Sequence, residues 1–334
     1  MFNSLIARYA TFQFARYITC RVPLCNPSSL RFYSKKSGSS NRWIERQIND
    51  SYTREAKHFD YKSRAAFKLL QIDDKFKIFS KDRNINVLDL GAAPGAWSQV
   101  ALERAKSGSN VLGVDLLVYR PPPGSSSMQA NILSKKTHEA IREHFKIAEI
   151  EKLRRKLAST EVIINQTALE IQETSIIESE NKLSDAEERE REKREKNLES
   201  VFEDQLYRPV DVVLSDMYVP LPQIGGFASQ TTNMPFLRMA NTSGLSFKDH
   251  SMSMDLCDAA LVASIDVLKK NGHFITKFFT GKEDKHYEMR LRKVFRRVYR
   301  YKPKACRPES KECYFVCMDK LDDFIDKKSV FQVA

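Results

Sequence analysis

A turn with two glycines, at residues 89–95, is the part of this sequence whose residue types and spacing point most directly to chemistry. It reads Asp-Leu-Gly-Ala-Ala-Pro-Gly between an apolar segment and a segment with a helical pattern. Glycine has no side chain, so such a turn lets the backbone approach a ligand closely. Gly91 and Gly95 are four residues apart, which excludes the dinucleotide pattern G-x-G-x-x-G, and the Walker pattern is absent as well.

An acidic residue, Asp115, ends the next apolar segment, 24 residues beyond Gly91. In nucleotide-binding α/β folds a carboxylate at this place accepts hydrogen bonds from ribose hydroxyls. An adenosine that carries no pyrophosphate requires the close glycine approach and the ribose acid, but no phosphate cradle. The pattern therefore predicts an adenosine-containing cofactor of this kind. A purely structural turn between a strand and a helix is the alternative.

Short apolar segments alternate with helical segments along most of the chain. The expected strands are residues 85–90, 110–115, 211–215, 273–278 and 313–318. The expected helices are residues 96–106, 132–145, 255–270 and about 284–298, preceded by a helical region over 43–76. This alternation indicates an α/β fold with a mostly parallel, doubly wound sheet.

Residues 146–208 interrupt this alternation. No glycine or proline occurs between Ser125 and Arg208, and opposite charges recur three or four residues apart within 182–199. The segment carries sixteen acidic against twelve basic residues, which disfavours binding to RNA. We expect a charged helical insertion that is solvated or that contacts assembly-factor proteins.

The first 44 residues have the composition of a targeting segment. They contain seven Lys or Arg residues and no acidic residue, which leaves only about +5 of the net charge of +12 for the rest of the chain. They are also rich in Ser and aromatic residues, and no apolar run is long enough to cross a membrane. Residues 31–34 resemble a protease processing site with Arg31 three residues before the cut. This composition predicts a mitochondrial transit peptide over 1–36 and a location in the matrix. A basic arm that contacts RNA is the alternative.

The six cysteines show no pattern of a metal site. Cys306, Cys313 and Cys317 form no C-x-x-C pair and have no His at zinc-ligand spacing. We expect buried, reduced thiols and no bound metal.

Residues 89–99, Asp-Leu-Gly-Ala-Ala-Pro-Gly-x-Trp-Ser-Gln, resemble the signature of the FtsJ/RrmJ family of 2′-O-ribose RNA methyltransferases. Further segments agree with that family in the same order, and these are residues 40–43, 63–69, 213–217 and 310–314. The resemblance implies a Rossmann-like fold that depends on S-adenosylmethionine, with a seven-stranded, mostly parallel sheet flanked by helices. The expected domain covers residues 40–325 and is interrupted by 146–208.

Within the family, residues 236–244 and 249–261 are similar to the mitochondrial enzymes that methylate uridine in large-subunit rRNA. This similarity implies that the partner is mitochondrial large-subunit rRNA or the precursor of the large ribosomal subunit. Two alternatives stay open. One is the same chemistry on a tRNA or a messenger cap, and the other is a ribosome assembly factor that keeps the fold without catalysis.

The resemblance also implies which residues contact S-adenosylmethionine. Where the family usually has an Asp near the adenine amino group this chain has Asn131, whose side-chain oxygen can still accept that hydrogen bond. The expected cofactor residues are Asp89, Gly91, Ala92, Pro94, Gly95, Trp97, Asp115, Leu116, Asn131 and Asp216.

A catalytic tetrad is implied at Lys68, Asp216, Lys277 and Glu312. Methyl transfer from a sulfonium requires alignment of the reacting atoms, and a ribose 2′-hydroxyl benefits from a base that removes its proton. We expect Lys277 to be that base. Its apolar flanks and Lys68 favour the neutral amine, whereas the two carboxylates favour the ammonium, so its protonation state stays open. Taken singly, a lysine in a strand is equally compatible with a side chain that reaches solvent. An Asp after a strand is equally compatible with a helix cap.

For RNA binding we expect Arg42, Arg64, Lys68 and the surface of residues 42–68. The aromatic residues among these basic residues are Trp43, Tyr52, Phe59 and Tyr61. Aromatic stacking on unpaired bases combined with phosphate contacts is a common way to hold a loop nucleotide. The alternative is that these aromatic residues pack the N-terminal helices against the sheet.

Overall fold

A computed structural model describes residues 50–172, 207–219 and 242–332, with the backbone alone for 156–172. The expected transit peptide, Arg42, Trp43 and much of the expected insertion lie outside the described residues. So do the matched segment 40–43 and most of the segment 236–244. No helix among the described residues is long and apolar enough to cross a membrane.

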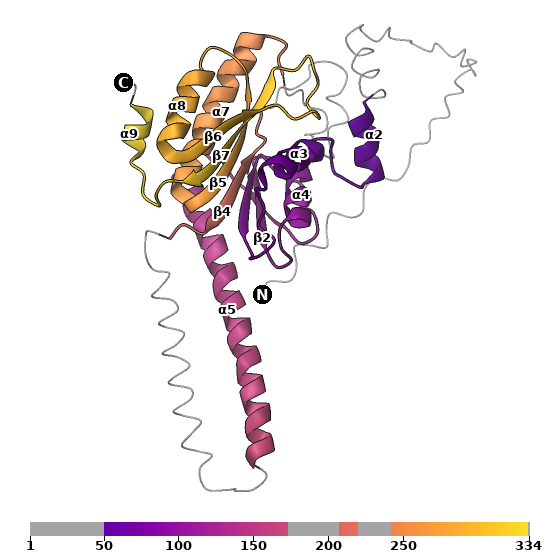
Figure 1. Ribbon diagram of the computed structural model, residues 1–334, viewed down its shortest axis with the longest axis vertical. Coiled ribbons are helices and arrows are strands. Elements are labelled where there is room, and N and C mark those ends of the chain that lie inside the picture. Colours follow the sequence, from indigo (N-terminus) through magenta and orange to yellow (C-terminus); the bar gives the residue numbers. More distant parts are fainter. Residues whose placement is uncertain (1–49, 173–206, 220–241, 333–334) are drawn as a thin grey trace, which may run out of the picture. The chain divides into compact units, whose positions relative to one another are not determined.

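Seven strands form one sheet in the order β3-β2-β1-β4-β5-β7-β6 (Figure 1). The pairs among β1 to β5 are parallel, and β7 runs antiparallel to both β5 and β6. This confirms the expected fold class. The strands are β1 (Asn86–Leu90), β2 (Asn110–Asp115), β3 (Ser126–Gln129), β4 (Val210–Ser215), β5 (Leu268–Phe279), β6 (Phe295–Tyr301) and β7 (Glu312–Lys320).

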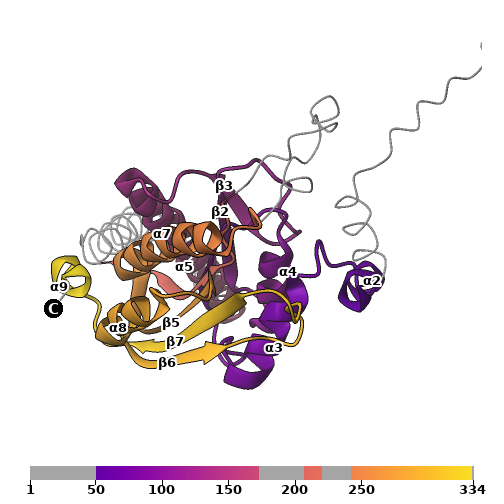
Figure 2. The ribbon, with the colours of Figure 1, turned by 90° about the horizontal axis from the view of Figure 1, so that it is seen from above.

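Helices cover both faces of the sheet (Figure 2). The described helices are α2 (Ser51–His58), α3 (Ala66–Phe76), α4 (Ala96–Arg104), α5 (Lys135–Gln172), α7 (Ser246–Val267), α8 (Asp284–Val294) and α9 (Lys327–Phe331). Residues of α3 and α4 pack on one face of the sheet, and residues of α5, α7 and α8 pack on the other.

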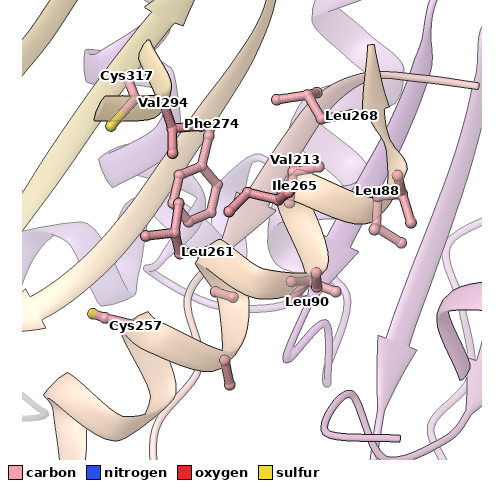
Figure 3. Close-up of a cluster of buried hydrophobic side chains, with 14 of the residues drawn as sticks. Leu88, Leu90, Val213, Cys257, Leu261, Ile265, Leu268, Phe274, Val294 and Cys317 are labelled. Atoms are coloured by element: carbon pink, nitrogen blue, oxygen red, sulfur yellow. The ribbon is translucent and has the colours of Figure 1, made fainter. Parts of the chain in front are cut away.

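Each face of the sheet has its own hydrophobic core. Leu88 and Leu90 of β1 face the α7 side together with Leu261 and Ile265 (Figure 3). The neighbouring residue Val87 faces the α3 and α4 side instead, because side chains alternate along a strand. Burial on both faces explains why the central strands read as nearly continuous apolar runs.

The four cysteines that the structure describes are free and buried, as expected for reduced thiols. They are Cys257, Cys306, Cys313 and Cys317. No group of three or more His, Cys, Asp or Glu side chains in the described ranges is placed to hold a metal ion.

The two peripheral strands β3 and β6 were not predicted from the sequence. β3 consists of Ser, Met and Gln residues, and β6 carries three arginines, so neither has the apolar pattern of a buried strand. The helix expected over 284–298 was therefore wrong at its end, since residues 295–301 pair with β7 as a strand. The helix expected over 255–270 instead runs from Ser246 to Val267, and residues from 268 onward join β5.

The expected helix over 132–145 begins at Lys135 and continues to Gln172, so the first residues of the expected insertion extend this helix. The helical region expected over 43–76 contains a break. Phe59 caps α2, and Asp60 follows with a φ of 55°, a left-handed conformation that ends a helix.

The sheet topology explains how residues far apart in sequence come together. The carboxyl ends of the parallel strands β1, β2, β4 and β5 lie at one edge of the sheet. The antiparallel strand β7 begins at that edge, where Glu312 is the register partner of Phe279. Residues that follow β1, β2 and β4 thus lie at the same edge of the sheet as the first residues of β7.

Candidate active site

The glycine turn between β1 and α4 requires glycine at both positions. Gly91 and Gly95 have φ values of 72° and 106°, which side chains disfavour. A Cβ at Gly91 would lie 2.7 Å from Cγ and 2.9 Å from Cα of Met217, and a Cβ at Gly95 would lie 2.8 Å from Cδ of Pro122. The Ala93–Pro94 peptide bond between them is cis. The left-handed backbone and the close packing of Met217 and Pro122 therefore both require glycine in this turn at the carboxyl edge of the sheet.

We predict that Gly95→Ala weakens S-adenosylmethionine binding by about tenfold or more, because the new methyl group strains the turn and displaces the loop at Pro122. Isothermal titration of the purified variant measures this affinity. Ala96→Gly, at the first residue of α4, serves as the control. Equal affinities of the Gly95 variant and the wild-type protein would contradict the prediction.

Asp115 connects the glycine turn to the loop after β2. Its Oδ2 accepts a hydrogen bond from the Ala93 backbone amide at 3.0 Å, and its Oδ1 accepts one from the Leu117 amide at 2.8 Å. Carboxylate oxygens can accept further bonds, so Asp115 retains acceptor capacity for a ribose. Leu116 follows Asp115, and its side chain is 59% exposed. Its contact with the cofactor stays a prediction.

Asn131 follows β3 and is exposed at the same edge of the sheet. Its Oδ1 accepts a hydrogen bond from the Leu133 amide at 3.0 Å, so the side chain already has a structural contact. An adenine contact by the remaining acceptor capacity stays a prediction.

Three of the expected cofactor residues lie behind the turn instead of on its surface. Asp89 is fully buried, accepts a hydrogen bond from Ser98 Oγ at 2.7 Å, and has a pKa that burial raises to about 7. Ala92 and Trp97 are also buried, and Trp97 Nε1 donates to the Ala65 carbonyl at 3.0 Å. These residues support the turn and α3 from within, and their contact with a cofactor stays a prediction.

The tetrad expected from the sequence is brought together at this edge in two ion pairs. Lys277 Nζ lies 3.0 Å from Asp216 Oδ1 and donates to the Asp216 carbonyl at 2.6 Å. Lys68 Nζ lies 2.5 Å from Glu312 Oε1. Lys68, Lys277 and Glu312 are all buried, with 6–9% of their surface exposed, whereas Asp216 is partly exposed. Four charged residues from three strands and a helix thus form one compact cluster.

Burial and charge act in opposite directions on the Lys68–Glu312 pair. Burial alone would lower the pKa of Lys68, but the Glu312 and Asp216 carboxylates outweigh it and raise that pKa. Burial alone would raise the pKa of Glu312, but Lys68 and then Lys277 lower it to about 2. Both groups are therefore charged near neutral pH.

Comparison with known proteins places this site in a family. Residues 61–320 match the FtsJ-like methyltransferases, a span that includes the glycine turn and all four residues of the cluster. The chain belongs to this family. Members of the FtsJ-like family use S-adenosylmethionine as the methyl donor, and the bare glycine turn with Asp115 beside it fits that cofactor.

Individual relatives cover most of the chain. The protein named rRNA methyltransferase 2, mitochondrial, from Saccharomyces cerevisiae is 44% identical over 300 residues, 88% of this chain and 92% of that protein. Ribosomal RNA large subunit methyltransferase E from Rickettsia bellii is 31% identical over 291 residues, 86% of this chain and 91% of that protein. A solved structure described as a ribosomal RNA methyltransferase from Plasmodium falciparum is 22% identical and covers 78% of this chain and 100% of that chain. Its TM-score of 0.46 is too low to support an argument.

Two tyrosines belong to the site of this FtsJ-like methyltransferase but were not assigned to it from the sequence. The buried Tyr314 hydroxyl contacts Glu312 Oε1 and lies 3.0 Å from Asp216 Oδ1, so it bridges the two ion pairs. Tyr218 places its ring 5.4 Å from Lys277 Nζ. The strand pattern offered a signal for Tyr314, because residues two apart on β7 share a face with Glu312.

The residues expected to bind RNA are largely engaged within the protein. The Arg64 guanidinium pairs with Asp50 and donates to the Ala305 carbonyl at 2.5 Å, and Lys68 is held by Glu312. Tyr52 and Tyr61 pack against Phe67 at ring-centroid distances of 5.4 and 5.6 Å. Phe59 remains exposed at 61%. The two tyrosines thus pack against α3, and binding of RNA by this surface stays a prediction.

Proposed function

We propose that this FtsJ-like methyltransferase transfers a methyl group from S-adenosylmethionine to the 2′-hydroxyl of a uridine in mitochondrial large-subunit rRNA. The observation that carries the proposal is the buried Lys277–Asp216 pair at the sheet edge that also holds the glycine turn. The similarity to a protein named mitochondrial rRNA methyltransferase 2 supports the choice of RNA and compartment.

Lys277 is the proposed general base. To act as a base, the Lys277 ammonium first gives up one of its three protons to solvent, which leaves a neutral amine with two N–H groups and one lone pair. The two contacts of Lys277 Nζ, to the carbonyl and to the Oδ1 of Asp216, use both N–H groups. The lone pair then remains as the acceptor for the ribose proton, and Asp216 fixes its direction.

The other members of the cluster position Lys277 and the ribose. The Lys68–Glu312 pair is buried and held together by its opposite charges, and Tyr314 connects Glu312 to Asp216 through its hydroxyl. A fixed frame of this kind reduces the reorganisation needed when the proton moves. When bound at the glycine turn, S-adenosylmethionine supplies the methyl group on a sulfonium. The residues proposed to hold it are Asp89, Gly91, Ala92, Pro94, Gly95, Trp97, Asp115, Leu116, Asn131 and Asp216.

We also propose the organisation of the whole chain. Residues 1–36 act as a transit peptide to the mitochondrial matrix, and residues 40–325 form the catalytic domain. The charged insertion at 146–208 serves a second role in large-subunit assembly through protein partners. The composition of the two segments supports these assignments.

The experiment that tests the proposed function maps 2′-O-methyl groups across mitochondrial large-subunit rRNA in cells with and without this protein. We expect one uridine site to lose its methyl group when the protein is absent, and to regain it when the wild-type gene is restored. Expression of the Lys277→Met variant in the same cells should not restore the methyl group at that uridine. A map that is unchanged in the absence of the protein would refute the proposal.

A further inference from the structure

A long basic segment lies next to the catalytic cluster and has no part in it. Residues 289–308 contain nine Lys or Arg residues and no Asp or Glu. The segment comprises the end of α8, the edge strand β6 and the loop that leads to β7. Five of its arginines pair with carboxylates that lie outside the segment, and these are Arg290, Arg292, Arg297, Arg300 and Arg307.

Four lysines that have no carboxylate partner in the described ranges lie where β6 passes α3. Among the described residues, Lys302 and Lys304 after β6 have no carboxylate within ion-pair distance, and neither do Lys75 and Lys77 at the end of α3. Asp73 and Asp74 of α3 pair instead with Arg104 of α4. All four lysines are exposed, so this part of the surface carries a local positive charge.

Aromatic rings lie among these lysines. Phe76 at the end of α3 packs against Tyr299 and Tyr301 of β6, with ring centroids 5.3 and 5.6 Å apart. Lys75 Nζ lies 4.4 Å from the centroid of the Tyr301 ring. Tyr299 remains 40% exposed, so one aromatic ring is available at the surface.

This basic and aromatic surface is continuous with the catalytic cluster. Tyr301 is the register partner of Tyr314, whose hydroxyl contacts Asp216 and Glu312. Lys302 Nζ donates to the Ser310 carbonyl, two residues before Glu312, at 2.7 Å. β6 contributes its last residues, 299–301, to this surface, and Lys302 and Lys304 follow directly.

We propose that this surface, formed by Lys75, Lys77, Tyr299, Tyr301, Lys302 and Lys304, binds the RNA that flanks the target nucleotide. The proposal rests on the proposed function and names a second part of the substrate site. The lysines contact phosphates, and Tyr299 stacks on an unpaired base. Charged side chains on an edge strand also prevent strand pairing between molecules. That purpose requires neither the aromatic cluster nor the lysines of α3.

The test compares two triple variants that lose the same charge. Lys75→Gln/Lys77→Gln/Lys304→Gln removes the proposed phosphate contacts. The control, Lys81→Gln/Lys106→Gln/Lys328→Gln, removes exposed lysines from α9 and from the loops before β1 and β2, which lie away from the carboxyl edge of the sheet. Binding to a transcript of mitochondrial large-subunit rRNA is measured by filter retention over a range of salt concentrations, together with the kcat and KM of methyl transfer.

We expect the first variant to bind the RNA about tenfold more weakly than the control and to show a smaller slope of log K against log salt, by about 2. The KM for RNA should rise while kcat is retained. Tyr299→Ala should weaken binding by about tenfold, and Tyr299→Phe should not, because stacking needs only the ring. If the wild-type protein methylates the transcript but the two triple variants bind it equally well, this proposal is overturned. A wild-type protein that neither binds nor methylates the transcript would refute the proposed function itself.

Discussion

Replacement of Lys277 by methionine is expected to lower the rate of methyl transfer to RNA by on the order of 10³-fold, the usual contribution of a general base. Lys277 Nζ is buried and held by two contacts to Asp216, whereas the other lysine of the cluster, Lys68, is held by Glu312. Methionine fills a similar volume and leaves the fold and the glycine turn unchanged. Single-turnover transfer of a radiolabelled methyl group measures the rate.

Two further variants distinguish loss of the base from loss of structure. Lys277→Arg keeps the charge and the contacts to Asp216, but a guanidinium does not release its proton, so this variant should be equally inactive. Lys328→Met changes an exposed lysine of α9 and should keep full activity. All three variants should bind S-adenosylmethionine as the wild-type protein does. A Lys277→Arg variant with nearly normal activity would contradict the assignment of the base.

Replacement of Glu312 by glutamine is expected to lower the free energy of unfolding by about 3–5 kcal/mol, because the Lys68 ammonium is left buried without its counter-charge. Removal of both charges in Lys68→Met/Glu312→Leu should restore most of that stability but none of the activity. Urea denaturation of the three proteins at neutral pH measures the difference. A Glu312→Gln variant as stable as the wild type would show that the pair is not a buried ion pair in solution.

The same pair predicts a dependence of stability on acidity. The pKa of Glu312 is about 2 in the folded protein, below the ordinary value of 4.5. A depressed carboxyl pKa stabilises the fold fully above 4.5, and that contribution is lost as the pH falls from 4.5 towards 2. The wild type should therefore lose stability more steeply over this window than Glu312→Gln. Parallel loss in the two proteins would contradict the assigned pKa.

The apolar strand pattern was sufficient to predict the centre of the sheet. The family resemblance implied the meeting of Asp216 with Lys277, and the parallel pairing of neighbouring strands β4 and β5 is the physical reason for it. Glu312 and Lys68 required more, because they are 244 residues apart and β7 is antiparallel. Only the family resemblance, and not spacing, could assign these two residues to the same cluster.

There is a physical reason why the peripheral strands could not be predicted. β6 is an edge strand with three arginines, so it lacks the apolar pattern by which a strand is recognised, and its basic residues resemble the end of the helix before it. The internal contacts of Arg64 could not be predicted for a related reason. Sequence reveals that an arginine is present, but only the fold shows that Asp50 and the Ala305 carbonyl already engage it.

The most direct measurement of the central claim is the identity of the methylated nucleoside. Purified protein, S-adenosylmethionine with a labelled methyl group and a transcript of mitochondrial large-subunit rRNA are incubated, and the RNA is digested to nucleosides for chromatography and mass spectrometry. We predict that the label appears in 2′-O-methyluridine and is absent when the Lys277→Met variant is used. Label on a nucleobase, or equal labelling by the variant, would contradict ribose methylation with Lys277 as the base.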